Sequence, residues 1–192
     1  MYYIQISRDL GCVEGNNGKM KYYVGNGRNL VTLKQYEYDV WRSTRKMQSV
    51  DTWREVMSKR IRSMTSSTIE EIESKLLELN TLHTLDFDSP SDEVLKKLFV
   101  IRNGYAFGQR GNYWIIGTYN QKRMFQLGSE EEYQLWIIAS SYKSLHSIID
   151  TISKKNNISL NASLRIVSRL AKTFVRAGIW TIEYQENGGT EQ

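Results

Sequence analysis

The segment 161–177 carries four basic side chains and no acidic one. The four bases follow one another at intervals of four, three and four residues, and they are Arg165, Arg169, Lys172 and Arg176. At 3.6 residues per turn, this spacing places all four within a sector of about 60° on one side of a helix. Guanidinium and ammonium groups bind phosphate through charge-assisted hydrogen bonds. The stripe is therefore a candidate surface for binding a polyanion.

Further polar residues extend this candidate surface. From residue 137 to 180 there are seven bases and a single acid, Asp150. The three bases outside the stripe are Lys143, Lys154 and Lys155. Asn161 leads the helix on the basic side, where its amide can reach the edge of a base. If the partner is DNA, we expect Asn161, Arg165 and Arg169 to face bases, and the other bases to face phosphates. A simple solvated helix face is the alternative interpretation of the stripe.

The same segment has an apolar side that must hold it against a core. The residues opposite the stripe are Leu164, Val167, Leu170, Ala171, Phe174 and Val175. A helix divided in this way lies on the surface of a domain, with one face buried and the other in water.

The chain also shows internal self-similarity, which bears on how this helix is positioned. Two hexapeptides, LHTLDF (82–87) and IWTIEY (179–184), match in residue type at a spacing of 97. Each follows an amphipathic segment that ends in a residue suited to the left-handed conformation, Asn80 or Gly178. We interpret the chain as a tandem duplication, with copy one at 1–88, copy two at 94–186 and a flexible tail at 187–192.

Six elements recur in the same order at offsets of about 92 to 98. Each copy is expected to run strand, strand, helix, helix, helix, strand. The helices are expected within 32–41, 49–61 and 66–79 of copy one, and within 128–136, 144–156 and 159–175 of copy two. The first helices should begin with capping boxes, formed by Thr32 with Gln35 and by Ser129 with Glu132. The join 88–93 holds the only proline and leads into a short helix capped by Ser91.

Three short helices followed by a strand resemble the winged helix-turn-helix domain, over 32–87 and again over 128–184. This resemblance implies an α+β fold made of two winged-helix-like units in tandem. It also implies that the third helix enters the major groove and that the trailing strand begins the wing. The leading strands depart from the family pattern, and copy two has no sequence left for a return strand in its wing. The leading strands are expected to pair with the trailing ones, within a copy or across copies.

The two third helices differ in charge. In copy one, residues 67–79 hold Glu70, Glu71, Glu73 and Glu78 against Lys75 alone. Phosphates repel such a helix, so copy one is expected to serve as a scaffold, a dimerisation surface or a docking site. The favoured function is a DNA-binding protein, a transcriptional regulator or a plasmid- or phage-type control protein. The alternative is a protein–protein assembly module that touches no nucleic acid, with contacts through copy one or through the aromatic strands 20–23 and 113–115.

The remaining composition excludes other classes. The formal net charge of +5 is modest. No apolar run reaches the 18 or so residues of a membrane span, and the first residues do not form a secretory signal. The single cysteine, Cys12, cannot form an internal disulfide, so a cytoplasmic location is expected. No phosphate-binding loop, nucleophile elbow or metal-ligand spacing is present, which predicts a non-enzyme with no cofactor and no metal.

Overall fold

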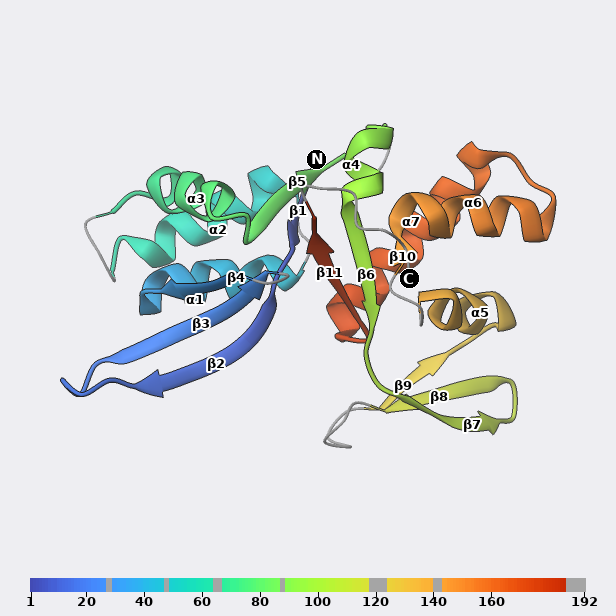
Figure 1. The fold of residues 1–192 in the computed structure, drawn as a ribbon, viewed down its shortest axis with the longest axis horizontal. Coiled ribbons are helices and arrows are strands. Elements are labelled where there is room, and N and C mark those ends of the chain that lie inside the picture. The colour runs from blue at the N-terminus through green and yellow to red at the C-terminus, as the bar shows by residue number, and fades with distance from the viewer. Residues whose placement is uncertain are drawn as a thin grey trace. The chain divides into compact units, whose positions relative to one another are not determined.

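The computed structural model describes residues 1–26, 29–46, 49–63, 67–86, 89–117, 124–139 and 143–185 of the 192-residue chain. It divides into two compact units, Met1–Asp86 (unit 1) and Phe87–Gln192 (unit 2). In the described residues the fold is mixed α+β, with seven α-helices and four small antiparallel sheets (Figure 1). The expected α+β class is therefore confirmed. The tail 187–192 lies outside the described residues.

Unit 1 combines a two-stranded sheet, a three-stranded meander and three helices. Its elements are β1 (Tyr2–Gln5), β2 (Arg8–Glu14), β3 (Met20–Asn26), β4 (Asn29–Leu33), α1 (Gln35–Ser43), α2 (Val50–Ile61), α3 (Ile69–Glu78) and β5 (Leu82–Leu85), with a 3-10 turn at Thr44–Lys46. The leading strand β1 pairs with the trailing strand β5, while β2, β3 and β4 form the meander. Figure 1 shows the meander as a long blue ribbon beside the helices of this unit.

Unit 2 has a similar order of elements after one additional short helix, with a two-residue strand where unit 1 has the 3-10 turn. Its elements are α4 (Asp92–Lys97), β6 (Leu98–Arg102), β7 (Tyr105–Arg110), β8 (Tyr113–Gly117), β9 (Met124–Leu127), α5 (Glu130–Ile138), β10 (Lys143–Ser144), α6 (Leu145–Asn156), α7 (Leu160–Ala177) and β11 (Trp180–Tyr184). Strand β6 lies between β10 and β11 and pairs with both. The strands β7, β8 and β9 form a second meander.

The two units repeat specific contacts as well as element order. The amide N–H of Ile6 donates to the Thr81 carbonyl at 3.2 Å, and that of Asn103 donates to the Ile179 carbonyl at 2.8 Å. The residue that caps the second helix, Ser49 in unit 1 and Ser144 in unit 2, pairs with the leading strand in both cases. The first and the trailing strand thus pair within each unit, whereas the aromatic strands expected at 20–23 and 113–115 pair inside the meanders, as β3 and β8.

A second repeated feature is a β-bulge in the first strand of each meander. Its glycine has a positive φ, +88° at Gly11 and +94° at Gly108, which other residues rarely adopt. The preceding side chain, Leu10 or Phe107, lies against a glycine of the neighbouring strand.

Three details differ from the sequence expectations. Four strands rather than two lead each set of three helices, because the meander strands are short and interrupted by polar residues and glycine. Thr32 lies in β4, so the capping box expected there is wrong; Glu37 instead accepts from the Lys34 amide at 2.8 Å. The third helix and trailing strand of unit 1 align with those of unit 2 at a spacing of 98 residues, which is also the spacing between the left-handed caps Asn80 and Gly178. The hexapeptides align in residue type at a spacing of 97.

A tryptophan at matching positions of α1 and α5 belongs to the core of each unit. Trp41 and Trp136 are both buried, and each donates its indole N–H to a backbone carbonyl. The acceptors are Thr81 at 2.9 Å and Asn103 at 3.3 Å, which lie where the leading and trailing strands meet. The first helix of each unit is thereby attached to its terminal strand pair.

The C-terminal cap of α7 provides a test that uses the repeat. Gly178 has φ +76°, and the equivalent residue in unit 1 is Asn80 with φ +49°. Gly178→Ala should destabilise the protein by roughly 1–2 kcal/mol, because a Cβ is strained in this conformation. Gly178→Asn should cost clearly less. Thermal unfolding followed by circular dichroism measures both, and an equal loss for the two variants would contradict the assignment.

Candidate nucleic-acid interface

Helix α7 is fixed at both ends by its own sequence. At its start, Ser159 Oγ accepts a hydrogen bond from the Ala162 amide at 3.2 Å, an N-cap that satisfies one orphan donor. Asn157 ends the preceding helix in the left-handed conformation, with φ +51°. A short turn therefore separates α6 from α7, and α7 runs without a break for 18 residues to the Gly178 cap.

One face of α7 is buried against α6 and β11. Of the six residues expected on the apolar side, Val167, Leu170, Ala171, Phe174 and Val175 are buried. The Phe174 ring meets Trp180 of β11 edge to face, with centroids 5.0 Å apart. Leu164 differs, since it is only partly buried and lines the groove described next.

The other face of α7 forms one wall of a groove of about 920 Å³. The facing wall comes from the chain leading into α4 and from α4 itself, including Pro90 and Leu95, with Ile149 of α6 between them. All four stripe residues line this groove, together with Asn161, Ser168 and Thr173. Three of the bases are exposed and Lys172 is half-buried. The structure thus brings together Asn161, Arg165, Arg169, Lys172 and Arg176.

The groove is electropositive. Four bases line it, and Asp92 is the one acid among the described lining residues. Arg169 Nη2 lies 3.9 Å from Glu131 Oε2, but both side chains are exposed, so this pair contributes little. A groove lined by four bases and one acid attracts anions, and the spacing of the bases along a helix suits a chain of phosphates better than a single one.

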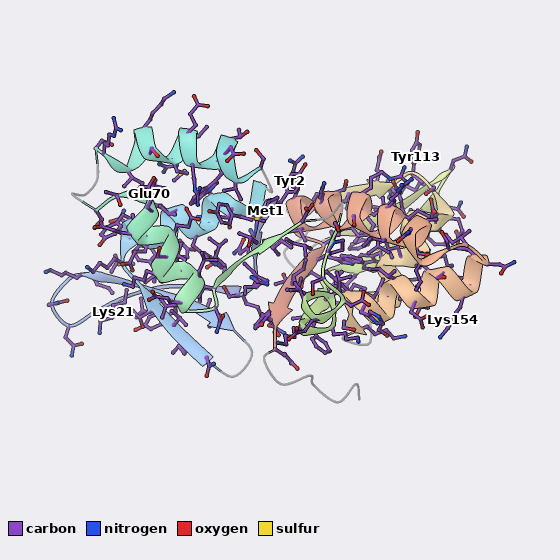
Figure 2. All side chains as sticks on the ribbon, turned by 90° about the horizontal axis from the view of Figure 1, so that it is seen from above. Met1, Tyr2, Lys21, Glu70, Tyr113 and Lys154 are labelled. Atoms are coloured by element: carbon purple, nitrogen blue, oxygen red, sulfur yellow. The ribbon has the colours of Figure 1, made fainter. Side chains whose placement is uncertain are left out.

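The other three predicted bases lie elsewhere in unit 2. Lys154 of α6, labelled in Figure 2, forms an ion pair with Asp150 at 2.7 Å. Lys155 donates to Gln134 Oε1 of α5 at 2.8 Å. Lys143 is half-buried in β10, opposite Val100. None of the three lines the groove.

The third helix of unit 1 presents the opposite charge. Glu70, labelled in Figure 2, is exposed, as are Glu71 and Glu78. Glu73 is buried and accepts two hydrogen bonds from Arg54, at 2.8 and 2.6 Å. This bidentate contact raises the pKa of the Arg54 guanidinium. The acidic character expected of α3 is therefore present at its surface, where it disfavours polyanions.

Neither a candidate metal-binding cluster nor a candidate membrane-spanning helix lies in the described part of the chain. It holds no group of three or more His, Cys, Asp or Glu placed to bind a metal ion. None of its helices has both the length and the apolar character needed to cross a bilayer. No protein-family model matches the sequence, and no curated protein is detectably similar to it. The candidate site therefore depends on its own geometry and charge.

The two faces of α7 can be tested with adjacent residues. Leu170 is 3% exposed, whereas the side chain of Arg169 is 69% exposed. Leu170→Ala should lower the free energy of unfolding by about 2–5 kcal/mol, because it leaves a cavity in the core. Arg169→Ala should change it by less than about 0.5 kcal/mol. Urea unfolding measures both, and similar losses would mean that α7 is oriented differently.

Proposed function

We propose that this protein binds double-stranded DNA and that α7 of unit 2 enters the major groove. The observation that carries the proposal is the exposed basic face of α7, which opens onto a groove with one acid among its described lining residues. An α-helix fits the major groove, where each base pair presents a distinct pattern of donors and acceptors. A transcriptional regulator or a plasmid- or phage-type control protein is the class that we infer.

The arrangement of elements supports a winged-helix-like unit. Helices α5, α6 and α7 are followed directly by β11, in the order that the resemblance requires. The return strand of the wing is replaced by β6, which pairs along β11 from Leu98 to Arg102. The leading strand of the unit thus takes the place of a return strand beside β11. We propose the same construction for unit 1, where β1 pairs with β5.

The positions along α7 suggest different roles for its polar residues. Asn161 and Arg165 lie in the N-terminal half of α7, the part of a recognition helix that contacts base edges, and Arg169 lies one turn further along the same face. Arginine reads guanine and asparagine reads adenine through paired hydrogen bonds. Lys172 and Arg176 lie further along the same face and are assigned to phosphates. Lys143, Lys154 and Lys155 are outside the groove and have at most a flanking role.

In this proposal unit 1 does not contact DNA bases. Its exposed glutamates on α3 repel phosphate, so it serves as a scaffold or docking surface for a protein. The alternative to DNA binding is an assembly module in which both units contact proteins only. That alternative is favoured by the acidic face of α3, which is chemically complementary to a basic protein surface.

Charge reversal on α7 tests the proposal. Arg165→Glu, Arg169→Glu and Lys172→Glu together should abolish binding to mixed duplex DNA fragments at low salt, because favourable phosphate contacts become repulsive. The measurement is fluorescence anisotropy with labelled duplex at two salt concentrations. A matched control reverses three exposed bases of unit 1, Lys59, Arg60 and Arg62, and changes the net charge equally.

The control variant should keep most of the wild-type affinity. Equal loss in the two triple variants would show that only net charge matters. Absence of binding by the wild-type protein at low salt would overturn the proposal and leave the assembly module.

The lysines outside the groove give a finer test. Lys154→Gln with Lys155→Gln should reduce the salt dependence of duplex binding less than Lys172→Gln with Arg176→Gln does. Each phosphate contact contributes a slope of about 0.9 log units per log unit of salt, so the second pair should lower it by about 1.8. Affinities across a salt series measure the slopes, and the reverse ranking would move the binding surface to α6.

A further inference from the structure

The meander of unit 2 has an outer face on which large side chains are exposed, although Ile115 on this face is buried. Paired residues in a sheet point to the same side, so the register defines this face. The pairs on it are Tyr105 with Gly117, Gly117 with Met124, Arg110 with Tyr113, and Ile115 with Gln126. Phe107 belongs to the same face, because its ring lies against Gly117 and leaves no room there for a Cβ. We call these residues the outer sheet face.

The opposite side of the same meander packs against α5 and contributes to the core of unit 2. Trp114 stacks on Tyr133 of α5, with ring centroids 3.7 Å apart and planes within 2°. Its indole N–H donates to Glu130 Oε2 at 3.1 Å. Ile116 and Leu127, on this side, are buried. The aromatic residues of the outer sheet face therefore do not belong to this core.

The outer sheet face exposes aromatic rings. Tyr105 is 58% exposed, and Phe107 and Tyr113 are each 49% exposed, so about half of each side chain is available to a ligand. A hollow of about 400 Å³ lies beside Tyr113, which is labelled in Figure 2, and is bounded also by Arg110, Ile115 and Met124. Three exposed aromatic residues on one small sheet form a flat surface on which planar ligands can stack.

Charge identifies the ligand class. Arg110 is the one charged side chain among the residues of the outer sheet face, and Gln126 adds an amide. No carboxylate lies among these residues, so the face disfavours a basic protein surface as its partner. Aromatic rings and arginine together are the groups on which successive unpaired bases stack, whatever their sequence.

We propose that the outer sheet face of unit 2 binds single-stranded nucleic acid by stacking unpaired bases on Phe107 and Tyr113, with Arg110 at the phosphate backbone. This site is separate from the groove of α7 and does not depend on the duplex-binding proposal. Binding is expected to tolerate different base sequences, since every base has a stacking face.

Unit 1 supplies an internal comparison. At its bulge, Leu10 takes the place of Phe107, and it too covers a glycine of the next strand, Gly25. Lys21 pairs with Val13 where Tyr113 pairs with Arg110. The aromatic pair is therefore found in unit 2 and not at the matching positions of unit 1. Phe107→Leu is also a compatible replacement, because leucine already occupies this position in the repeat.

The test uses the full chain and a fluorescein-labelled 12-nucleotide oligothymidine at low salt. Phe107→Leu and Tyr113→Leu should each weaken binding by about 5- to 150-fold, the loss of one base-stacking contact. Tyr113→Phe keeps the ring and should bind within about twofold of the wild type. Leu10→Ala in unit 1 is the matched control and should also bind as the wild type does. Circular dichroism melts show whether each variant is folded.

The outcomes separate this inference from the duplex proposal. The leucine variants should retain duplex binding. If one of the two binding activities is not observed, the proposal for the other is unaffected. Two results would overturn the inference: no oligothymidine binding by the wild type, or wild-type affinity in folded leucine variants. A third contrary result is a change from dimer to monomer in the leucine variants with unaltered oligothymidine affinity, which would make this face a self-association surface.

Discussion

The position of α7 depends on how the chain is held where this helix passes into β11. The Ile179 amide donates back to the Phe174 carbonyl at 3.0 Å, and the Ile179 carbonyl accepts from Asn103. Asn103 also donates its side-chain amide to Thr181 Oγ1 at 2.8 Å, and its own carbonyl accepts the indole N–H of Trp136. One residue at the end of β6 thus joins the first helix, the third helix and the trailing strand. Because these bonds are partly buried, losing one leaves polar groups without a full set of partners and destabilises the junction.

The same constraint explains why a segment far away in the sequence completes each unit. A single trailing strand has unpaired backbone groups on both edges, which must find partners. In unit 2, β6 satisfies one edge of β11 over five residue pairs and uses its own second edge for β10. The helices can then pack on one side, with the apolar face of α7 inward and its basic face outward. The candidate site is a consequence of this packing, since no residue of the stripe is needed for the core.

Much of this arrangement could be predicted from the sequence because it depends on local patterns. The 3.6-residue period of α7 indicated both its length and its two faces, and Gly178 marked its end as expected. The sequence located the aromatic meander strands β3 and β8 but not the other meander strands, although the bulge glycines Gly11 and Gly108 are an additional signal at a spacing of 97. These strands are short and mix polar with apolar residues, so they have little periodicity of their own.

The long-range pairing and the grouping of site residues could not be predicted in the same way. The local sequence of Leu98–Arg102 does not indicate that this strand lies between β10 and β11, because tertiary packing determines which strands pair. Lys154 and Lys155 are close to the stripe in sequence, yet their partners Asp150 and Gln134 place them on other surfaces. The groove wall formed by Pro90 and Leu95 could not be predicted from the sequence for the same reason.

The central claim is that the basic face of α7 contacts duplex DNA. The most direct measurement is a titration of the isotope-labelled protein with a short duplex, followed by backbone amide chemical shifts. We expect the largest changes from Asn161 to Arg176, with the amides of α3 unaffected. Changes confined to unit 1, or none along α7, would contradict it.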